Sequence, residues 1–273
     1  MRKQKLKAMK AVSGVYTWIV YLFLYAPILV IVFFSFNISR RNITFQGFTL
    51  DWYVKLFDNQ ALLKSFGNTI IVAVCSTLVA TAVGTLAAVG MARYRFRGRG
   101  IVDALLYVPV VIPEIVLGIA LLSFFSLAHV PLGLISLIIA HATFSIPFVV
   151  FTVRARLAGY DKSVDEAALD LGANRTRVFF HITLPILLPG IISGAMLAFT
   201  LSIDDVIISF FTNGPGSVTY PLKVWEMIKS GVSPDVNALS TLILLGTVAL
   251  VLASQAKAIG TALKDRKKLV RRD

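Results

Sequence analysis

The sequence predicts an all-α membrane protein with six transmembrane helices, from its composition, the length of its apolar blocks and the distribution of its charges. Of the 273 residues, 57% are hydrophobic and only 15% are charged, whereas roughly a quarter of the residues of an ordinary soluble domain are charged. The mean hydropathy is +0.80. This composition excludes a disordered chain and argues against a single soluble domain.

Six apolar blocks have the length that a membrane requires, since a helix needs about 20 such residues to cross the ~30 Å hydrocarbon layer. We expect one transmembrane domain over 1–273, with spans at residues 15–36, 67–92, 104–127, 134–153, 186–211 and 237–256. The first block is longer than the roughly 7–15 apolar residues of a secretory signal, and no small-x-small cleavage site follows it. We therefore interpret it as an uncleaved anchor.

The basic residues are concentrated in alternate connections. The formal net charge is +13. If the helices alternate across the membrane, 21 of the 27 Lys and Arg lie in the two tails and in the loops after the second and fourth spans. Lys and Arg of short loops are retained in the cytoplasm, so both termini are predicted to be cytoplasmic. The positive charge is thus mainly a topology signal, and we expect no nucleic-acid partner.

The predicted cytoplasmic loop 154–185 has the pattern of a helical hairpin. Ser163 and Glu166 form a capping box at the start of a short helix, and Gly172 is the expected left-handed terminator. A second amphipathic stretch follows from Arg175 and is predicted to stop at Pro185, where the next span begins. Such a hairpin either packs on its own protein or is offered to a partner.

The residues of this hairpin resemble the complete EAA signature of the membrane subunits, or permeases, of ABC importers. The matching positions are Glu166, Ala167, Ala168, Gly172, Ile182, Leu184 and Pro185. The resemblance implies the type I (MetI-like) importer fold, in which this loop couples the permease to a cytosolic ATPase.

Over nearly the whole chain, the sequence is similar to the permeases of spermidine/putrescine importers, the PotC-type family. The segments that carry the similarity include Trp52-Tyr53, Arg93-Tyr94-Arg95-Phe96-Arg97-Gly98, Pro113-Glu114, Ala198-Phe199-Thr200-Leu201-Ser202-Ile203-Asp204-Asp205 and Gly214-Pro215. The similarity implies that the substrate pathway contains Trp52, Glu114, Ser202, Asp204 and Asp205. The family usually has Asp where this chain has Glu114. The longer side chain of Glu114 keeps the charge and leaves the preferred substrate size open.

Three carboxylates lie inside predicted spans, independently of any resemblance. Glu114, Asp204 and Asp205 occupy positions where a charge costs roughly 2.5–3.5 kcal/mol, and no span offers them a Lys or Arg. They must face a water-filled cavity, be protonated, or meet a cation from outside. Because neighbours on a helix point about 100° apart, we expect one Asp to face the pathway and the other to contact a neighbouring helix or cap.

A polyamine is complementary to such a site. Its ammonium groups are spaced along a methylene chain and pair with carboxylates at intervals and with aromatic faces between them. Trp52 and Tyr53 can supply aromatic faces, although an anchor at the membrane surface is an equally ordinary role for Trp52.

The sequence contains no Gly-Lys dipeptide and so no phosphate-binding loop, and its three His have no metal-ligand spacing. We expect no enzymatic activity, no metal and no cofactor in this chain, with ATP and Mg²⁺ bound by partner ATPase subunits.

We expect the membrane-spanning subunit of a type I ABC importer for polyamines, in a bacterial inner membrane. Its partners would be a second permease, two ATP-binding subunits, an extracytoplasmic binding protein and membrane lipid. We expect a heterodimer of permeases, and this sequence alone also allows a homodimer. The small residues Gly190 and Gly194 permit close helix packing and are compatible with a subunit contact.

The alternatives are an ABC permease for another small substrate such as iron, a stand-alone secondary cation transporter, or a membrane enzyme. Inverted repeats or broken helices would favour a secondary transporter, and the sequence shows no convincing repeat.

Overall fold

The computed structural model describes residues 2–39, 44–161, 163–230 and 233–249, which are mostly helical. The contacts divide the chain into two compact units, residues 1–60 with 227–273, and residues 61–226. Within the described residues the only β pairing is a bridge between Asn37 and Phe48.

The first unit contains helices α1 (Arg2–Phe34) and α2 (Asp51–Asp58) and the helix Pro234–Ala249. The loop between α1 and α2 folds around the buried side chain of Asn37, which accepts from the Gln46 N–H and donates to the Thr44 carbonyl, both at 2.8 Å. The apolar part of α1 is not buried against the rest of the chain.

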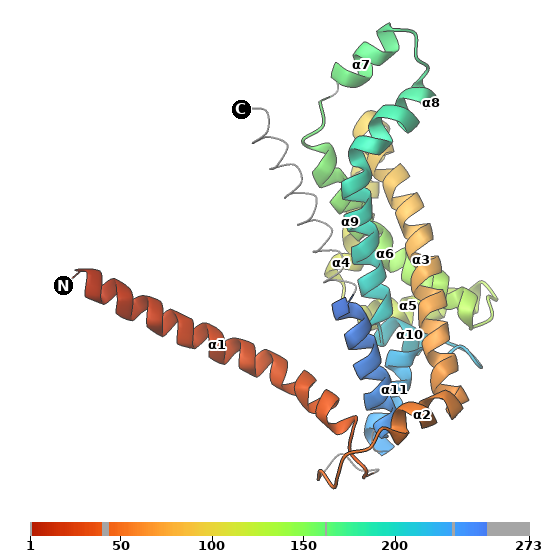
Figure 1. The fold of residues 1–273 in the computed structure, drawn as a ribbon. Coiled ribbons are helices and arrows are strands. Elements are labelled where there is room, and N and C mark those ends of the chain that lie inside the picture. Colours follow the sequence, from red (N-terminus) through yellow and green to blue (C-terminus); the bar gives the residue numbers. More distant parts are fainter. Residues whose placement is uncertain (1, 40–43, 162, 231–232, 250–273) are drawn as a thin grey trace. The chain divides into compact units, whose positions relative to one another are not determined.

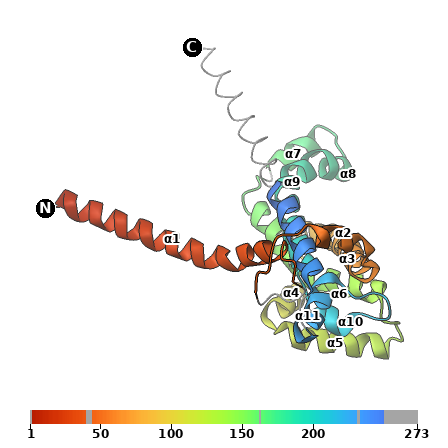
Figure 2. The same ribbon diagram turned by 60° about the horizontal axis from the view of Figure 1, so that its bottom comes forward.

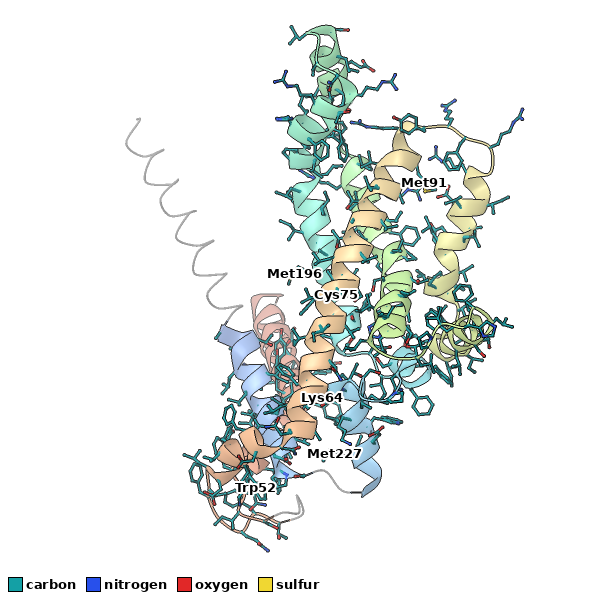
Figure 3. All side chains as sticks on the ribbon, turned by 90° about the vertical axis from the view of Figure 1, so that its right-hand side faces the viewer. Trp52, Lys64, Cys75, Met91, Met196 and Met227 are labelled. Atoms are coloured by element: carbon teal, nitrogen blue, oxygen red, sulfur yellow. The ribbon has the colours of Figure 1, made fainter. Side chains whose placement is uncertain are left out.

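The second unit is organised around three long helices that lie side by side (Figure 1). They are α3 (Gln60–Arg93), α6 (Leu134–Leu157) and α9 (Leu184–Ile203). Their shared core consists mainly of small and β-branched residues, among them Ala80, Ala88, Val149, Val153 and Ala198, and it also contains Leu187. Small residues permit a close approach of the backbones. Figure 3 marks Cys75 and Met91 along α3.

The glycines of α9 pack inside the chain. A Cβ on Gly190 would lie 2.7 Å from the Arg156 Cβ, and one on Gly194 would lie 3.3 Å from the Val149 Cα. The small-residue face of α9 is therefore occupied by α6 of the same chain, whereas the sequence was compatible with its use between subunits.

The single crossing predicted over 104–127 is two helices. α4 (Arg99–Val111) and α5 (Glu114–Leu127) meet at an angle of 115°. Pro113 disfavours the helical conformation for the residue before it, and Ile112 is extended, with φ −74° and ψ 137°. α5 packs against α6 and the short helix α10 (Ile207–Thr212) through a second apolar core of Leu121, Phe125, Ala140, Phe144 and Ile208 (Figure 2).

The span predicted over 186–211 also differs from the structure, because α9 ends at Ile203 and α10 begins only at Ile207. Asp204 and Asp205 lie in this break and not on a continuous helix.

Four described helices are long and apolar enough to cross a membrane, or up to five if α4 and α5 form one broken span. The predicted sixth span, 237–256, corresponds in its described part to the helix Pro234–Ala249, and residues 250–256 lie outside the described residues.

The second unit is completed by the hairpin helices and by the part of α11 up to Glu226. They are α7 (Ser163–Asp170), α8 (Arg175–Val178), the π-helical turn η1 (Phe179–Thr183) and α11 (Tyr220–Ser230).

The packing of α3 on α6 predicts that Gly84→Ala lowers the thermal stability of the purified protein in detergent. The added Cβ would lie 2.8 Å from the Val149 Cβ and 3.2 Å from the Ile146 carbonyl oxygen, and overpacking of this kind costs about 1–3 kcal/mol. Gly90→Ala on the same helix is the matched control, since its Cβ meets nothing within 4 Å. Equal melting temperatures for the two variants would contradict this packing.

Candidate functional site

The three membrane carboxylates line one cavity of about 650 Å³ in the second unit. Glu114 comes from the start of α5, and Asp204 and Asp205 come from the break between α9 and α10. The remaining wall is apolar and aromatic and consists of Ile115, Leu201, Val206, Ile207, Phe210, Phe211 and Trp225. No Lys or Arg is among these described lining residues, so the cavity concentrates negative charge without a basic counterpart.

The two breaks in the helices create this cavity. Pro113 ends α4 and places Glu114 in the first turn of α5, where the N–H groups of a helix favour a negative charge. Asp204 and Asp205 follow Ile203 in the break. Asp204 is exposed, whereas the side chain of Asp205 is buried. Two interruptions of helix thus bring together carboxylates that lie 90 residues apart in the sequence.

Asp205 is the capping member of the pair. Its carboxylate accepts from the N–H groups of Ile208 at 3.1 Å and Ser209 at 2.7 Å, in the first turn of α10. Its Oδ2 also lies 3.4 Å from the His141 Nε2 of α6. The prediction that one Asp makes a cap or a helix contact is therefore confirmed, and the structure identifies it as Asp205.

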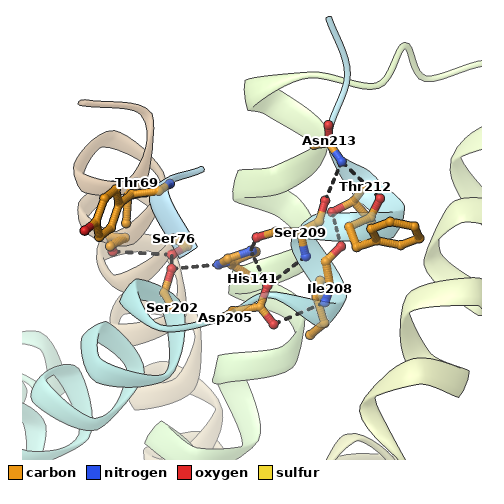
Figure 4. A network of polar contacts seen from close by, with 12 residues as sticks. Thr69, Ser76, His141, Ser202, Asp205, Ile208, Ser209, Thr212 and Asn213 are labelled. Atoms are coloured by element: carbon orange, nitrogen blue, oxygen red, sulfur yellow. Dashed lines mark hydrogen bonds and ion pairs between the residues drawn. The ribbon is translucent and has the colours of Figure 1, made fainter. Parts of the chain in front are cut away.

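Ser202 does not line the cavity. Its side chain is buried in the network of Figure 4, where its hydroxyl lies 2.7 Å from the His141 Nδ1 and 3.1 Å from the Ser76 hydroxyl. The sequence grouped Ser202 with the substrate residues, and the structure brings it to the same place but one layer behind the cavity wall.

Trp52 belongs to the first unit, and its side chain makes contacts within that unit. Only 8% of its surface is exposed, its Nε1–H donates to the Asn37 carbonyl at 2.7 Å, and the Lys55 ammonium lies 4.9 Å from its ring centroid. Trp52 therefore holds the loop between α1 and α2 onto α2.

The predicted hairpin of the loop 154–185 is present, with one predicted cap misplaced. Gly172 has φ +87°, and the bonds from Gly172 N–H to the Leu169 carbonyl and from Ala173 N–H to the Ala168 carbonyl form the expected helix end. At the other end, Ser163 is the first helical residue, and its N–H donates to Asp161 at 2.9 Å. This bond holds the pKa of the Asp161 carboxyl below its ordinary value.

The second stretch of the hairpin does not stop at Pro185. α8, η1 and α9 form one helix from Arg175 to Ile203, and the Leu184 N–H bonds to the Phe179 carbonyl in the wider π turn. A π turn relieves the clash and the missing donor that a proline would otherwise introduce. The EAA-like hairpin is therefore continuous with a membrane helix that ends at the acidic cavity.

Asp165 anchors this hairpin, which the sequence did not predict. Its carboxylate lies 2.5 Å from the guanidinium of Arg93 at the end of α3 and accepts from Tyr160 at 2.5 Å and Thr183 at 3.1 Å. Burial raises the pKa of Tyr160, as does its hydrogen bond to Asp165, so the hydroxyl remains a donor. Arg93 and Asp165 are 72 residues apart, and no local pattern pairs them.

The anchored α7 exposes part of the predicted signature. Glu166 and Ala167 are exposed and Ala168 is half-buried. The adjacent Leu171, which is outside the signature, has 89% of its surface exposed. Within the described part of the chain, no group of three His, Cys, Asp or Glu side chains is placed to hold a metal ion.

Comparison with known proteins matches residues 80–259 to a family described as "Binding-protein-dependent transport system inner membrane component". The spermidine/putrescine transport system permease protein PotC of Escherichia coli (strain K12) is 44% identical over 246 residues, which cover 90% of this chain and 93% of the relative. The putrescine transport system permease protein PotI of the same strain is 42% identical over 236 residues, covering 84% of each chain.

Solved structures show the same fold at low identity. A chain of a bacterial ABC transporter that imports the acidic polysaccharide alginate has a TM-score of 0.72 at 16% identity, covering 92% of this chain and 96% of its own. A chain of the inward-facing MetNI methionine ABC transporter has a TM-score of 0.57 at 17% identity, covering 76% of this chain and 95% of its own. The predicted all-α fold of type I importer permeases is confirmed.

The different surroundings of the two aspartates predict different effects of neutralising each on stability. Asp205→Asn removes a carboxylate that accepts two buried N–H bonds and faces His141, and should lower the free energy of unfolding by about 1–3 kcal/mol. Asp204→Asn is the matched control, because the residue surface of Asp204 is exposed, and it should leave stability nearly unchanged. Thermal unfolding of the purified protein in detergent measures both, and equal losses would contradict the assignment of Asp205 as the cap.

Proposed function

Since this chain belongs to the family of inner membrane components of binding-protein-dependent transport systems, we propose that it is the membrane-spanning subunit of an ATP-driven importer of polyamines. The substrates would be linear di- and triamines such as putrescine and spermidine, which the names of the relatives PotC and PotI mention.

The observation that carries the substrate class is the acidic cavity. Glu114, Asp204 and Asp205 meet there without a lining Lys or Arg, and a charge in the membrane without a partner is unfavourable. A cationic substrate supplies the missing charge. The rings of Phe210, Phe211 and Trp225 and the aliphatic wall suit the methylene segments between ammonium groups.

The proposed roles of the carboxylates follow from their exposure and reach. Asp204 and Glu114 contact the ammonium groups directly, with Glu114 reaching one methylene further than an Asp would. Asp205 contributes a charge whose position is held by α10 and His141. Ser202 belongs to the proposed pathway through the elements that it holds in place. A role of Trp52 in the pathway rests on the sequence resemblance alone, because in the structure its side chain holds the loop of the first unit.

Transport would require that the hairpin and the cavity move together. The helix from Arg175 to Ile203 is continuous over 29 residues, roughly 43 Å at 1.5 Å per residue, and it joins the hairpin to Asp204. A displacement of the hairpin by a cytosolic ATPase would therefore move the acidic break directly and alternate access to the cavity.

The partners follow from the same arrangement. Two ATP-binding subunits would dock on the hairpin around Glu166, Ala167, Ala168, Gly172, Ile182, Leu184 and Pro185, and they would hold the ATP and Mg²⁺. A second permease would complete the pathway, most simply as a heterodimer, and an extracytoplasmic binding protein would deliver substrate. The chain would have no enzymatic activity and no cofactor of its own, with both termini in the cytoplasm.

The proposal predicts that Glu114→Gln and Asp204→Asn each reduce uptake of labelled putrescine and spermidine by about tenfold or more, since each removes a charge-assisted contact worth about 1.5–3 kcal/mol. Uptake is measured in a bacterial strain that lacks its own polyamine importers and expresses the complete transporter. Glu226→Gln removes the same charge from an exposed residue that pairs with Lys223 and should transport normally. Normal uptake by both acidic variants, or uptake of iron and no polyamine by the unmodified transporter, would contradict the proposed substrate.

The docking role predicts that Gly172→Val abolishes copurification of the ATP-binding subunits. A β-branched residue at φ +87° strains the turn that orients α7. Gly159→Ala in the same loop has an ordinary φ and no close neighbour, and the ATP-binding subunits should copurify with it. Intact copurification with Gly172→Val, at equal membrane abundance, would overturn the docking role.

A further inference from the structure

A buried histidine lies directly behind the acidic cavity. His141 of α6 is 2% exposed, and both of its ring nitrogens have partners. Nδ1 lies 2.7 Å from the Ser202 hydroxyl, and Nε2 lies 3.1 Å from the Ser209 hydroxyl and 3.4 Å from the Asp205 carboxylate (Figure 4). His141 thus connects the end of α9 with the start of α10 across their break.

The network continues away from the cavity to a fourth helix. The Ser202 hydroxyl lies 3.1 Å from that of Ser76, which is on α3. The polar chain Ser76, Ser202, His141, Asp205 therefore joins four helices, in an environment where an unsatisfied polar group is costly. Ser202 and His141, at the centre of this chain, each contact a polar side chain on either side.

Asp205 has few ways to move within this arrangement. One carboxylate oxygen accepts from Ile208, and the other accepts from Ser209 and faces the imidazole. A carboxylate held from two sides keeps its orientation and its charge at the cavity wall, whereas Asp204, which is exposed, can follow a substrate. The cavity thus has one fixed and one adaptable carboxylate at the same break.

We propose that His141 is a positioning residue of the substrate pathway, which holds Asp205 at the cavity wall and, through Ser202 and Ser76, ties the break between α9 and α10 to α3. This inference rests on the proposed polyamine transport. It explains how Ser202 belongs to the pathway although it does not line the cavity. His141 itself makes no contact with the substrate.

Two substitutions at His141 separate the two halves of the network. Glutamine places its amide nitrogen near the position of Nε2 and keeps a donor for Asp205, whereas asparagine reaches only the position of Nδ1 and keeps the contact with Ser202. Leucine removes both contacts at a similar volume. A merely structural histidine would be replaced about equally by the two amides.

The test is the concentration dependence of putrescine and spermidine uptake by the complete transporter, with membrane abundance and copurification of the partner subunits measured in parallel. We expect His141→Leu and His141→Asn to raise KM about tenfold with a smaller change in maximal rate, as the loss of a hydrogen bond to a charged group predicts. His141→Gln should stay within about threefold of the unmodified transporter. The double variant His141→Leu/Ser202→Ala should be no worse than His141→Leu, because the two side chains act in one chain of contacts.

Ser145→Ala is the matched control. Ser145 lies one turn further along α6, is buried, and has a hydroxyl without a hydrogen-bond partner within the described residues. It should leave KM unchanged. The KM of the Ser145→Ala variant also separates a local effect at His141 from a general sensitivity of α6 to substitution.

The outcomes distinguish this inference from the function on which it rests. If the unmodified transporter does not take up polyamines, the proposed function fails and the inference with it. If it does, but His141→Leu keeps its KM at normal abundance, or His141→Gln is as impaired as His141→Asn, the positioning role alone is overturned. If His141→Leu fails to assemble, the comparison of the two amide variants still decides the question.

Discussion

A carboxylate inside a membrane protein must be satisfied by hydrogen bonds, by a counter-charge or by water, and the second unit of this chain is built around that constraint. Asp205 satisfies this constraint because it lies between the end of one helix and the start of another. Its carboxylate receives the free N–H groups of α10, which exist only because α9 has stopped at Ile203. The break, the cap and the polar contact with His141 are therefore parts of one arrangement, and the cavity is the space that it leaves.

The same principle applies to the prolines. Pro113 interrupts the helix between α4 and α5 and so places Glu114 in the first turn of α5, where it lines the same cavity as the aspartates. Pro185 has the opposite effect, since a π turn absorbs it and the helix continues. The chain is thus broken at the cavity and continuous towards the hairpin, and this difference allows a movement at one end of α9 to reach the other.

Much of the candidate site could be predicted because its signals are local. A capped helix ended by a glycine is encoded within ten residues, and the positive φ of Gly172 follows from that pattern. An apolar block with a single acid is equally visible, so Glu114 and the aspartate pair stand out. The contacts of Arg93 with Asp165 and of Ser202 with His141 could not be predicted, because each joins two residues of different helices that are 61 or more positions apart in the sequence. The helix breaks at Pro113 and Asp204 were missed for a related reason: a run of apolar residues is compatible with one long helix or two short ones, and packing of α5 on α10 selects the second.

The amino-acid sequence by itself determined that this chain is a helical membrane protein and which acids are too costly to be placed in a membrane without a purpose, and it predicts which side of the membrane the basic loops prefer. These properties depend on composition, length and charge, which are additive along the chain. Only the tertiary structure decided which acid is fixed and which is exposed, that Trp52 holds its own loop, and that a histidine stands behind the acidic wall. Those outcomes depend on which side chains meet across helices, and the meeting is set by backbone breaks and close packing that no single stretch of sequence contains.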